Sequence, residues 1–329
     1  MDNTNNYLLK VDNLKTYFAI KKGLLRRTVG YVRAVDGISF SIEKGQTLGL
    51  VGESGCGKTT VARTVVRLVP ATAGRVVFEK MDVLSADRVR LRQLRKDISI
   101  IFQDPYGSLN PRMTIGNIIG EPLKVQRGTA GSELSDRVAA LLTKVGLSAE
   151  AISRYPHEFS GGQRQRIGVA RALSLEPKLV ICDEPVSALD VSIQSQILNL
   201  LKDLQDEFGL TYLFIAHDLA VVEFFCAVVA VMYMGKIVER AEATELYRNP
   251  LHPYTEALMS AIPQVDPALR GRRSAPGGEV PSALSPAVGC SFGPRCPWRQ
   301  RQCQEQKPEL EESTDYKGHF VACWKCRGN

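Results

Sequence analysis

The 329-residue sequence has no uninterrupted apolar run of the about 18–20 residues that a membrane-spanning helix needs. Its most apolar segment, 219–234, is short and is interrupted by Glu223, so we expect a buried helix followed by a buried strand there. Residues 1–6 lack the basic and apolar regions of a signal peptide. These absences predict a protein that stays in the cytosol and does not itself cross a membrane.

The sequence also lacks a dense block of charge of one sign. Lys and Arg together number 42 against 35 Asp and Glu, which gives a formal net charge of +7. The basic residues are scattered, with modest clusters at 21–27, 88–96 and 270–273. Scattered basic residues indicate a solvated surface more readily than a nucleic-acid site, so we expect no nucleic-acid partner.

Residues 52–59 have the pattern G-x-x-x-x-G-K-T, between an apolar strand predicted at 47–51 and a helix predicted at 60–68. In this context the glycines let backbone N–H groups curl around phosphates at the N-terminus of the helix. We expect Lys58 to reach the β- and γ-phosphates of ATP and Thr59 to help hold Mg²⁺. A glycine-rich turn without a ligand is the alternative, which the order of strand, loop and helix disfavours. The predicted ATP-binding residues of this loop are Gly52, Glu53, Ser54, Gly55, Cys56, Gly57, Lys58, Thr59 and Thr60.

A second apolar strand, predicted at 179–182, ends in two carboxylates, Asp183 and Glu184. Asp183 can bind Mg²⁺ through water, and Glu184 can act as the general base that polarises an attacking water. The neighbouring Cys182 lies among apolar residues, where packing explains a cysteine better than chemistry does. The sequence therefore predicts a site for ATP hydrolysis.

Strands and helices alternate along the rest of this region. We expect strands at 8–18, 34–42, 98–102 and 211–216, helices at 115–145, 160–173 and 194–207, and loops at 21–31 and 105–111. Such alternation predicts an α/β fold whose largely parallel sheet is covered on both faces.

The segment Phe159-Ser160-Gly161-Gly162-Gln163 resembles the signature motif of the ABC ATPases, which other phosphate-loop enzymes lack. With the two motifs above, Gln103 and His217, it identifies about residues 8–263 as similar to the ABC superfamily. The resemblance implies a phosphate-loop (RecA-like) core with a helical subdomain at about 104–172. It also implies that the chain is an ATPase.

The resemblance further implies roles for single residues. Gln103 is similar to the Q-loop glutamine, which senses Mg²⁺ and the attacking water, and His217 is similar to the switch histidine, which contacts the γ-phosphate. Family members stack an aromatic residue of the first strand on adenine. Phe18 or Tyr17 could do this, and Phe18 is slightly favoured, with simple core packing as the alternative for each.

Family members also pair head to tail, so that each signature motif serves the ATP of the partner. Residues 187–190 resemble the D-loop, which crosses the dimer interface. A helix that begins at Ser160 could offer N–H groups and the positive end of its dipole to the opposing γ-phosphate. The implied contacts to the partner's ATP are Ser160, Gly161, Gly162, Gln163 and Asp190.

Three segments resemble the peptide, nickel and glutathione importers in particular: 33–40, 102–111 and 249–255. The form of 105–111 and the basic insertion before Arg33 are similar to the F-type ATPase subunit. The resemblance implies a heterodimer with a D-type ATPase, two transmembrane permeases and an external binding protein, at the cytoplasmic face of the cell membrane. Segment 105–123 would receive a permease's coupling helix, and an ordinary helical insertion is the alternative. Nickel, glutathione, export, and a soluble ABC ATPase acting on ribosomes or DNA stay open as alternatives to peptide import.

Composition changes after Ile262, where prolines recur and cysteines crowd together. We therefore expect an ATP-binding domain at 1–262 and a small Cys-rich C-terminal domain at 263–329, too short for a large core of its own. Four thiolates suit either a [4Fe–4S] cluster or a tetrahedral Zn²⁺. The family resemblance favours the cluster, whereas the pair Cys323-x-x-Cys326 keeps zinc open and Cys326 could be a spare thiol. The predicted metal ligands are Cys290, Cys296, Cys303 and Cys323.

Overall fold

The computed structural model describes residues 6–23, 27–104, 106–260 and 288–326. The chain forms two compact units, each built from several stretches of sequence. The first contains Met1–Leu8, Ile42–Gln46 and Ser85–Ile215, and the second contains Leu9–Ser41, Thr47–Leu84 and Ala216–Asn329. The predicted domain boundary at 262/263 lies outside the described residues.

The first unit combines three parallel strands with helices. Its strands follow the order β8-β7-β6, and both strand pairs are parallel. Its elements are α2 Arg88–Asp97, β6 Ile98–Ile101, α3 Ile115–Arg127, α4 Gly131–Lys144, the 3₁₀ turns η1 Ala149–Ser153 and η2 Pro156–Glu158, α5 Gly161–Leu173, β7 Leu179–Asp183, α6 Val191–Phe208 and β8 Thr211–Ala216.

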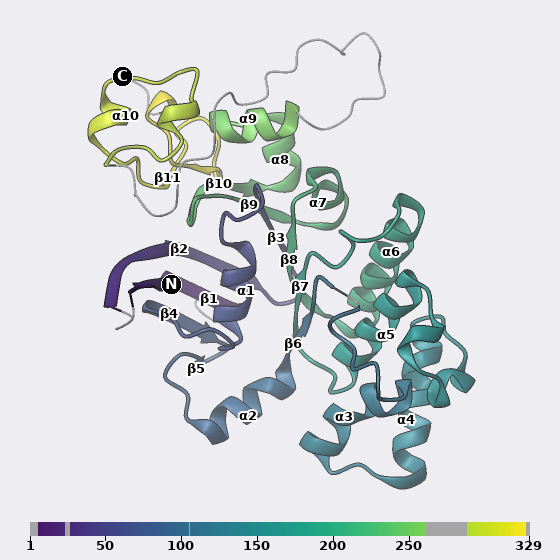
Figure 1. The fold of residues 1–329 in the computed structure, drawn as a ribbon. Helices are drawn as coiled ribbons and strands as arrows, with labels where there is room; N and C mark the ends of the chain where they lie inside the picture. The colour runs from purple at the N-terminus through teal and green to yellow at the C-terminus, as the bar shows by residue number, and fades with distance from the viewer. Residues whose placement is uncertain (1–5, 24–26, 105, 261–287, 327–329) are drawn as a thin grey trace. The chain divides into compact units, whose positions relative to one another are not determined.

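The helices of this unit follow from local sequence signals. Thr114 caps α3, since its hydroxyl accepts the N–H of Asn117, and Gly128 ends the helix in the left-handed conformation. The apolar residues on one face of α3 are buried, and α3 packs against α4 and α5 (Figure 1). Strands β7 and β8 are buried along their whole length, as expected for parallel strands with both faces covered. The predicted strands at 179–182 and 211–216 and the helices around 115–145 and 160–173 are thus confirmed.

The second unit contains both parallel and antiparallel pairing. Its elements are β1 Tyr7–Lys22, β2 Arg27–Glu43, β3 Thr47–Val51, α1 Lys58–Val65, β4 Ala73–Phe78, β5 Met81–Asp82, α7 Leu219–Phe225, β9 Val228–Tyr233, β10 Lys236–Glu242, α8 Ala243–Arg248, α9 Pro253–Ser260, the 3₁₀ turn η4 Gly293–Arg295, α10 Gln302–Glu305, β11 Glu311–Glu312, β12 Phe320–Val321 and the 3₁₀ turn η5 Trp324–Cys326.

The expectation of a largely parallel sheet is wrong for this unit. β3 and β9 are parallel, but β9, β10, β12 and β11 pair antiparallel in that order. A separate sheet of order β2-β1-β4-β5 has antiparallel pairs β1–β4 and β4–β5, with Val11 opposite Val76 (Figure 1). Short turns connect β4 to β5 and β9 to β10, and such connections favour antiparallel neighbours over the crossovers that parallel strands need. The pairs β1–β4 and β10–β12 instead join strands that are distant in the sequence.

The predicted loop at 21–31 is also wrong over most of its length. β1 continues to Lys22 and β2 begins at Arg27. Side chains at this end of the strand pair are largely exposed, with Val29 57% and Tyr31 54% exposed. A solvated pair of strands gives little hydrophobic alternation, so its basic residues resembled those of a loop.

The described C-terminal residues belong to the second unit and join its sheet. β12 pairs antiparallel with β10, with Val321 opposite Glu239. The carboxylate of Glu239 is fully buried and lies 2.7 Å from Nε2 of His319, and it accepts the backbone N–H groups of Leu251 and His252. A buried carboxylate is stable only with such partners, so this cluster ties the C-terminal segment to β10 and to the turn before α9.

The buried ring of His252 predicts a loss of stability in acid. Burial lowers its pKa to about 4, although the Glu239 carboxylate opposes this shift. The unfolded chain takes up a proton near about pH 6.5 while the folded ring stays neutral, so the free energy of unfolding should fall as the pH drops from about 6.5 to 4, by up to about 3 kcal/mol. Urea unfolding at several pH values measures this.

The matched variant is His252→Asn. Nδ1 of His252 accepts the N–H of Tyr254 at 3.0 Å, and an amide oxygen can accept the same bond without titrating. We expect the variant to lose less stability than the wild type over this pH range. Identical pH dependence in the two proteins would show that His252 does not contribute.

Candidate ATP-binding and hydrolysis site

The phosphate loop follows β3, whose five residues are all buried. Two positions require glycine for steric reasons. A Cβ on Gly52 (φ +150°) would lie 2.1 Å from the carbonyl oxygen of Met232, and one on Gly57 (φ +111°) would lie 2.0 Å from that of Ala34. Only glycine tolerates both the backbone angle and the close approach. The two glycines of the G-x-x-x-x-G-K-T pattern thus shape the loop itself.

Helix α1 begins at Lys58, two residues before the predicted start, so Lys58 and Thr59 lie in its first turn. Gly57 occupies the N-cap with no side-chain cap hydrogen bond, and the backbone N–H groups at a helix N-terminus can bind an anion. The buried Lys58 donates from Nζ to the carbonyl oxygens of Gly52 (2.7 Å) and Glu53 (3.1 Å). The ammonium is therefore held against the loop. Burial raises the pKa of the Cys56 thiol, consistent with a packing role for Cys56.

The two carboxylates after β7 have different surroundings. Asp183, the last residue of β7, is 1% exposed, whereas Glu184 is partly exposed. Gln103 donates from Nε2 to Oε2 of Glu184 at 2.9 Å. Glu184 has φ +50°, a conformation that is rare for a residue with a side chain and that concentrates at functional sites. The structure thus brings Gln103 and Glu184 into direct contact.

The signature residues form the start of α5. Ser160 is the N-cap, and its Oγ accepts the N–H of Gln163 (3.3 Å), while Oε1 of Gln163 accepts the N–H of Ser160 (3.0 Å). This reciprocal capping box fixes the first turn. A Cβ on Gly162 would lie 2.6 Å from Cγ2 of Ile193 on α6, so Gly162 permits close packing of α5 and α6. Ser160 is exposed.

Two further predicted residues, Asp190 and His217, lie just before helices. Asp190 caps α6, because its carboxylate accepts the N–H of Ile193 at 3.0 Å. Ser187 donates from Oγ to the carbonyl oxygen of Glu184 at 3.1 Å, which links the predicted D-loop to the predicted base. His217 is exposed after β8, before Asp218 caps α7. The capping roles of Asp190 and Asp218 were missed in the sequence, although Asp before an apolar helix is a standard capping signal.

The structure separates the two adenine-stacking candidates. The hydroxyl of Tyr17 donates to the Asp36 carboxylate, and burial together with this bond raises the pKa of Tyr17 to about 12. Phe18 is 43% exposed. Phe18 therefore offers a ring surface, while Tyr17 is engaged with β2.

The four predicted metal ligands are all partly buried, and the backbone N–H of Cys290 donates to the carbonyl oxygen of Cys303 at 2.8 Å. Burial raises the pKa of the Cys290 and Cys296 thiols, and the neighbouring thiols of Cys303 and Cys323 raise it further. Cys326, left aside in the prediction, shares a hydrogen bond with Cys323 that lowers the pKa of Cys326 and raises that of Cys323. Within the described ranges, no three His, Cys, Asp or Glu side chains are arranged to hold one metal ion.

Glu53 has two partners that the sequence did not single out. Its backbone N–H donates to the hydroxyl of Tyr254 at 2.8 Å, and its carboxylate pairs with Arg295. These partners lie 201 and 242 residues away in the chain, so no local pattern could have indicated them.

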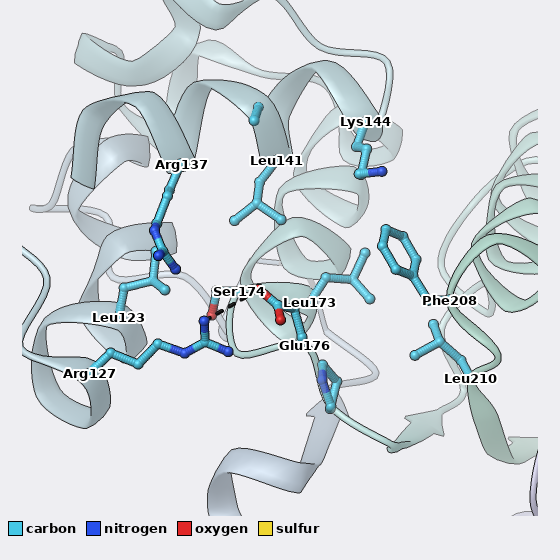
Figure 2. A pocket seen from close by; sticks show the side chains of 12 residues that line it. Leu123, Arg127, Arg137, Leu141, Lys144, Leu173, Ser174, Glu176, Phe208 and Leu210 are labelled. Atoms are coloured by element: carbon cyan, nitrogen blue, oxygen red, sulfur yellow. Dashed lines mark hydrogen bonds and ion pairs between the residues drawn. The ribbon is translucent and has the colours of Figure 1, made fainter. Parts of the chain in front are cut away.

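A cavity of about 610 Å³ lies among helices of the first unit (Figure 2). Leu123, Leu141 and Phe208 line it, together with basic side chains. Arg127 bonds to Glu176 and to the carbonyl oxygen of Leu175, and Lys144 pairs with Glu207. None of the predicted ATP-binding residues lines this cavity, so it is not the predicted nucleotide site.

Two family patterns match the chain. Residues 35–187 match the family described as ABC transporter, and residues 238–303 match the oligopeptide/dipeptide transporter C-terminal region. The oligopeptide transport ATP-binding protein AppF of Bacillus subtilis is 51% identical over 319 residues, which cover 96% of each chain. The chain belongs to the ABC transporter family. Within it, the chain groups with the oligopeptide and dipeptide transport ATP-binding proteins.

Other relatives agree with this membership. The oligopeptide transport ATP-binding protein OppF of Salmonella typhimurium is 52% identical, with 97% of this chain and 96% of the relative covered. The solved structure of cbiO1 from Clostridium perfringens, part of the ABC transporter complex cbiONQ, has a TM-score of 0.63 at 28% identity and covers 74% of this chain and 92% of its own. The dimeric structure of the ATP-binding cassette MJ0796 in a post-hydrolysis state, bound to ADP and Pi, has a TM-score of 0.64 at 28% identity. The match covers 71% of this chain and 98% of that chain. The ABC ATPase fold is thereby confirmed.

Proposed function

We propose that this ABC protein hydrolyses ATP to drive the import of di- or oligopeptides across the cytoplasmic membrane. The observation that carries the hydrolysis part of the proposal is the contact between Gln103 and the strained Glu184, because this contact holds the carboxylate in place as a base. The oligopeptide and dipeptide transport proteins that share about half of its residues support the substrate class.

The phosphate loop is proposed to bind the triphosphate of ATP. The N–H groups at the start of α1 and the buried ammonium of Lys58 would contact the phosphates. Mg²⁺ would neutralise charge on the β- and γ-phosphates, and the Thr59 hydroxyl and the buried Asp183 carboxylate provide the oxygen donors that this ion prefers. Phe18 is proposed to stack on adenine, since its ring is exposed.

Glu184 is proposed to take the proton of the attacking water. Gln103 would hold the carboxylate and orient that water, and His217 would contact the γ-phosphate. The exposed turn at Ser160, with Gly161, Gly162, Gln163 and Asp190, would contact the ATP of a partner ATPase. The dimeric ATP-binding cassette among the structural neighbours supports this pairing.

We propose a D-type ATPase as that partner, with two permeases and an external binding protein completing the importer. None of the described helices has the length and hydropathy that crossing a bilayer requires. Attachment to permeases would place the chain at the cytoplasmic face of the membrane. Affinity purification from detergent-solubilised membranes tests this assembly. Two permeases and a second ATPase should co-purify, and recovery of ribosomal proteins without a permease would instead favour a soluble ABC ATPase.

Cys290, Cys296, Cys303 and Cys323 are proposed to hold a [4Fe–4S] cluster, with Zn²⁺ as the alternative. Four cysteines match the donor set of either group. Thiolates around one zinc ion must approach a common point about 2.3 Å from each sulfur, whereas those around a cluster stand further apart. Anaerobic purification tests this: iron and sulfide in the protein support the cluster, and one equivalent of zinc contradicts it.

A further inference from the structure

An ion pair joins Arg295 of the C-terminal segment to Glu53 of the predicted phosphate loop. Arg295 donates from its two terminal nitrogens to the two carboxylate oxygens of Glu53, at 2.9 and 3.0 Å. The side chain of Arg295 is 6% exposed and that of Glu53 is 27% exposed. A bidentate, largely buried pair of this kind is directional and is poorly screened by solvent.

Surrounding aromatic residues hold this pair in place. The hydroxyl of Tyr254 accepts the N–H of Glu53 at 2.8 Å, so Glu53 is held by both its backbone and its side chain. The ring of Tyr254 lies 4.6 Å from that of Tyr233 and 5.5 Å from that of Phe292, which belongs to the C-terminal segment. The guanidinium of Arg295 lies 5.9 Å from the rings of Tyr233 and Phe292. The segment is therefore packed against the residues that support the loop.

The ion pair between Glu53 and Arg295 affects nucleotide binding because Glu53 carries a negative charge in the phosphate loop. Glu53 directly follows Gly52, and its carbonyl oxygen accepts from the Lys58 ammonium. A carboxylate at this position would repel a triphosphate, and the guanidinium of Arg295 cancels its charge. Arg295 is also the last residue of η4 and directly precedes Cys296, so its position depends on how the Cys-rich segment folds.

We propose that Arg295 is a positioning residue that neutralises and fixes Glu53 in the phosphate loop, so that the C-terminal segment sets the affinity for ATP. The proposal rests on the proposed function, in which this loop binds the phosphates. It assigns to the Cys-rich segment a direct effect on the nucleotide site.

The test is a charge series in the full-length protein, read out as the dissociation constant of a fluorescent ATP analogue. Arg295→Met leaves Glu53 unneutralised and should weaken binding about 3- to 30-fold. Glu53→Gln alone removes the repelling charge and should tighten binding. The double variant restores the local charge balance and should bind within about twofold of the wild type, a rescue that the loss of mere packing would not give.

Two controls keep the outcomes distinct. Arg301→Met removes a 91% exposed arginine from the same segment and should change nothing. Lys58→Ala should abolish binding, and if it binds as the wild type does, the proposed phosphate site is wrong, whatever the Arg295 variants do. If Lys58→Ala loses binding while Arg295→Met binds normally, or if Glu53→Gln fails to rescue Arg295→Met, the proposal about Arg295 is wrong.

Arg295→Lys serves as the second variant if Arg295→Met does not fold. It keeps the positive charge but loses the bidentate geometry, so it should bind the ATP analogue severalfold more weakly than the wild type. Unchanged affinity in Arg295→Lys would overturn the proposal.

Discussion

Glu184→Gln should lower the turnover of ATP by the assembled transporter roughly 10²–10⁴-fold, the usual contribution of a general base. The replacement keeps an oxygen that can accept the bond from Gln103, which is 2.9 Å long in the wild type, so the local geometry should persist. Only the ability to take a proton from water is lost. ATP binding should be retained, because the phosphate loop is unchanged. Steady-state phosphate release and nucleotide binding, measured on the same preparation, separate the two effects.

Glu207→Gln is the matched control for this prediction. Glu207 lies on α6, where its carboxylate pairs with Lys144 and is about half exposed. Exposed pairs of this kind contribute little, so the control should turn over ATP like the wild type. An unchanged rate in Glu184→Gln would refute the assignment of Glu184 as the base.

Gly52→Ala should abolish nucleotide binding and destabilise the protein by about 3 kcal/mol or more, at the severe end for a single substitution. The added Cβ would lie 2.1 Å from the carbonyl oxygen of Met232 and 3.0 Å from Sγ of Cys56. The carbonyl belongs to the buried strand β9, which cannot move aside without breaking its pairing with β3. Calorimetry and ATP titration measure the two losses.

Gly55→Ala provides the comparison within the same loop. Gly55 has φ +79°, but a Cβ there would meet nothing within 4 Å. Gly55→Ala should therefore lower the free energy of unfolding only by the backbone strain, about 1–2 kcal/mol. Equal destabilisation by the two variants would show that the contact with Met232 does not determine the need for glycine at position 52.

Much of the site could be predicted because its chemistry requires fixed local patterns. Gly52 and Gly57 are required by backbone angles and close approach, and the capping box of Ser160 and Gln163 requires two residues three positions apart. Buried parallel strands such as β3 and β8 appear as short apolar runs. Each of these signals lies within a few consecutive residues, so the sequence displays it directly.

The remaining features depend on contacts between distant residues. The pairing of β12 with β10 and the buried cluster of Glu239 and His319 join parts of the chain 80 residues apart. His252 was noted only as part of a family segment, yet it is buried beside that cluster. The ion pair of Glu53 and Arg295 is similarly long-range. Such pairs leave no periodicity in the sequence, so local patterns could not indicate them.

The central claim is that ATP hydrolysis by this chain drives peptide import, and the most direct test is peptide-dependent ATP turnover by the purified transporter in liposomes. The assembly, supplied with its binding protein and a mixture of di- and oligopeptides, should hydrolyse ATP faster and accumulate peptide inside the vesicles, and Glu184→Gln should abolish both. Hydrolysis that responds to nickel or glutathione but not to peptides, or that proceeds without any uptake, would contradict the account.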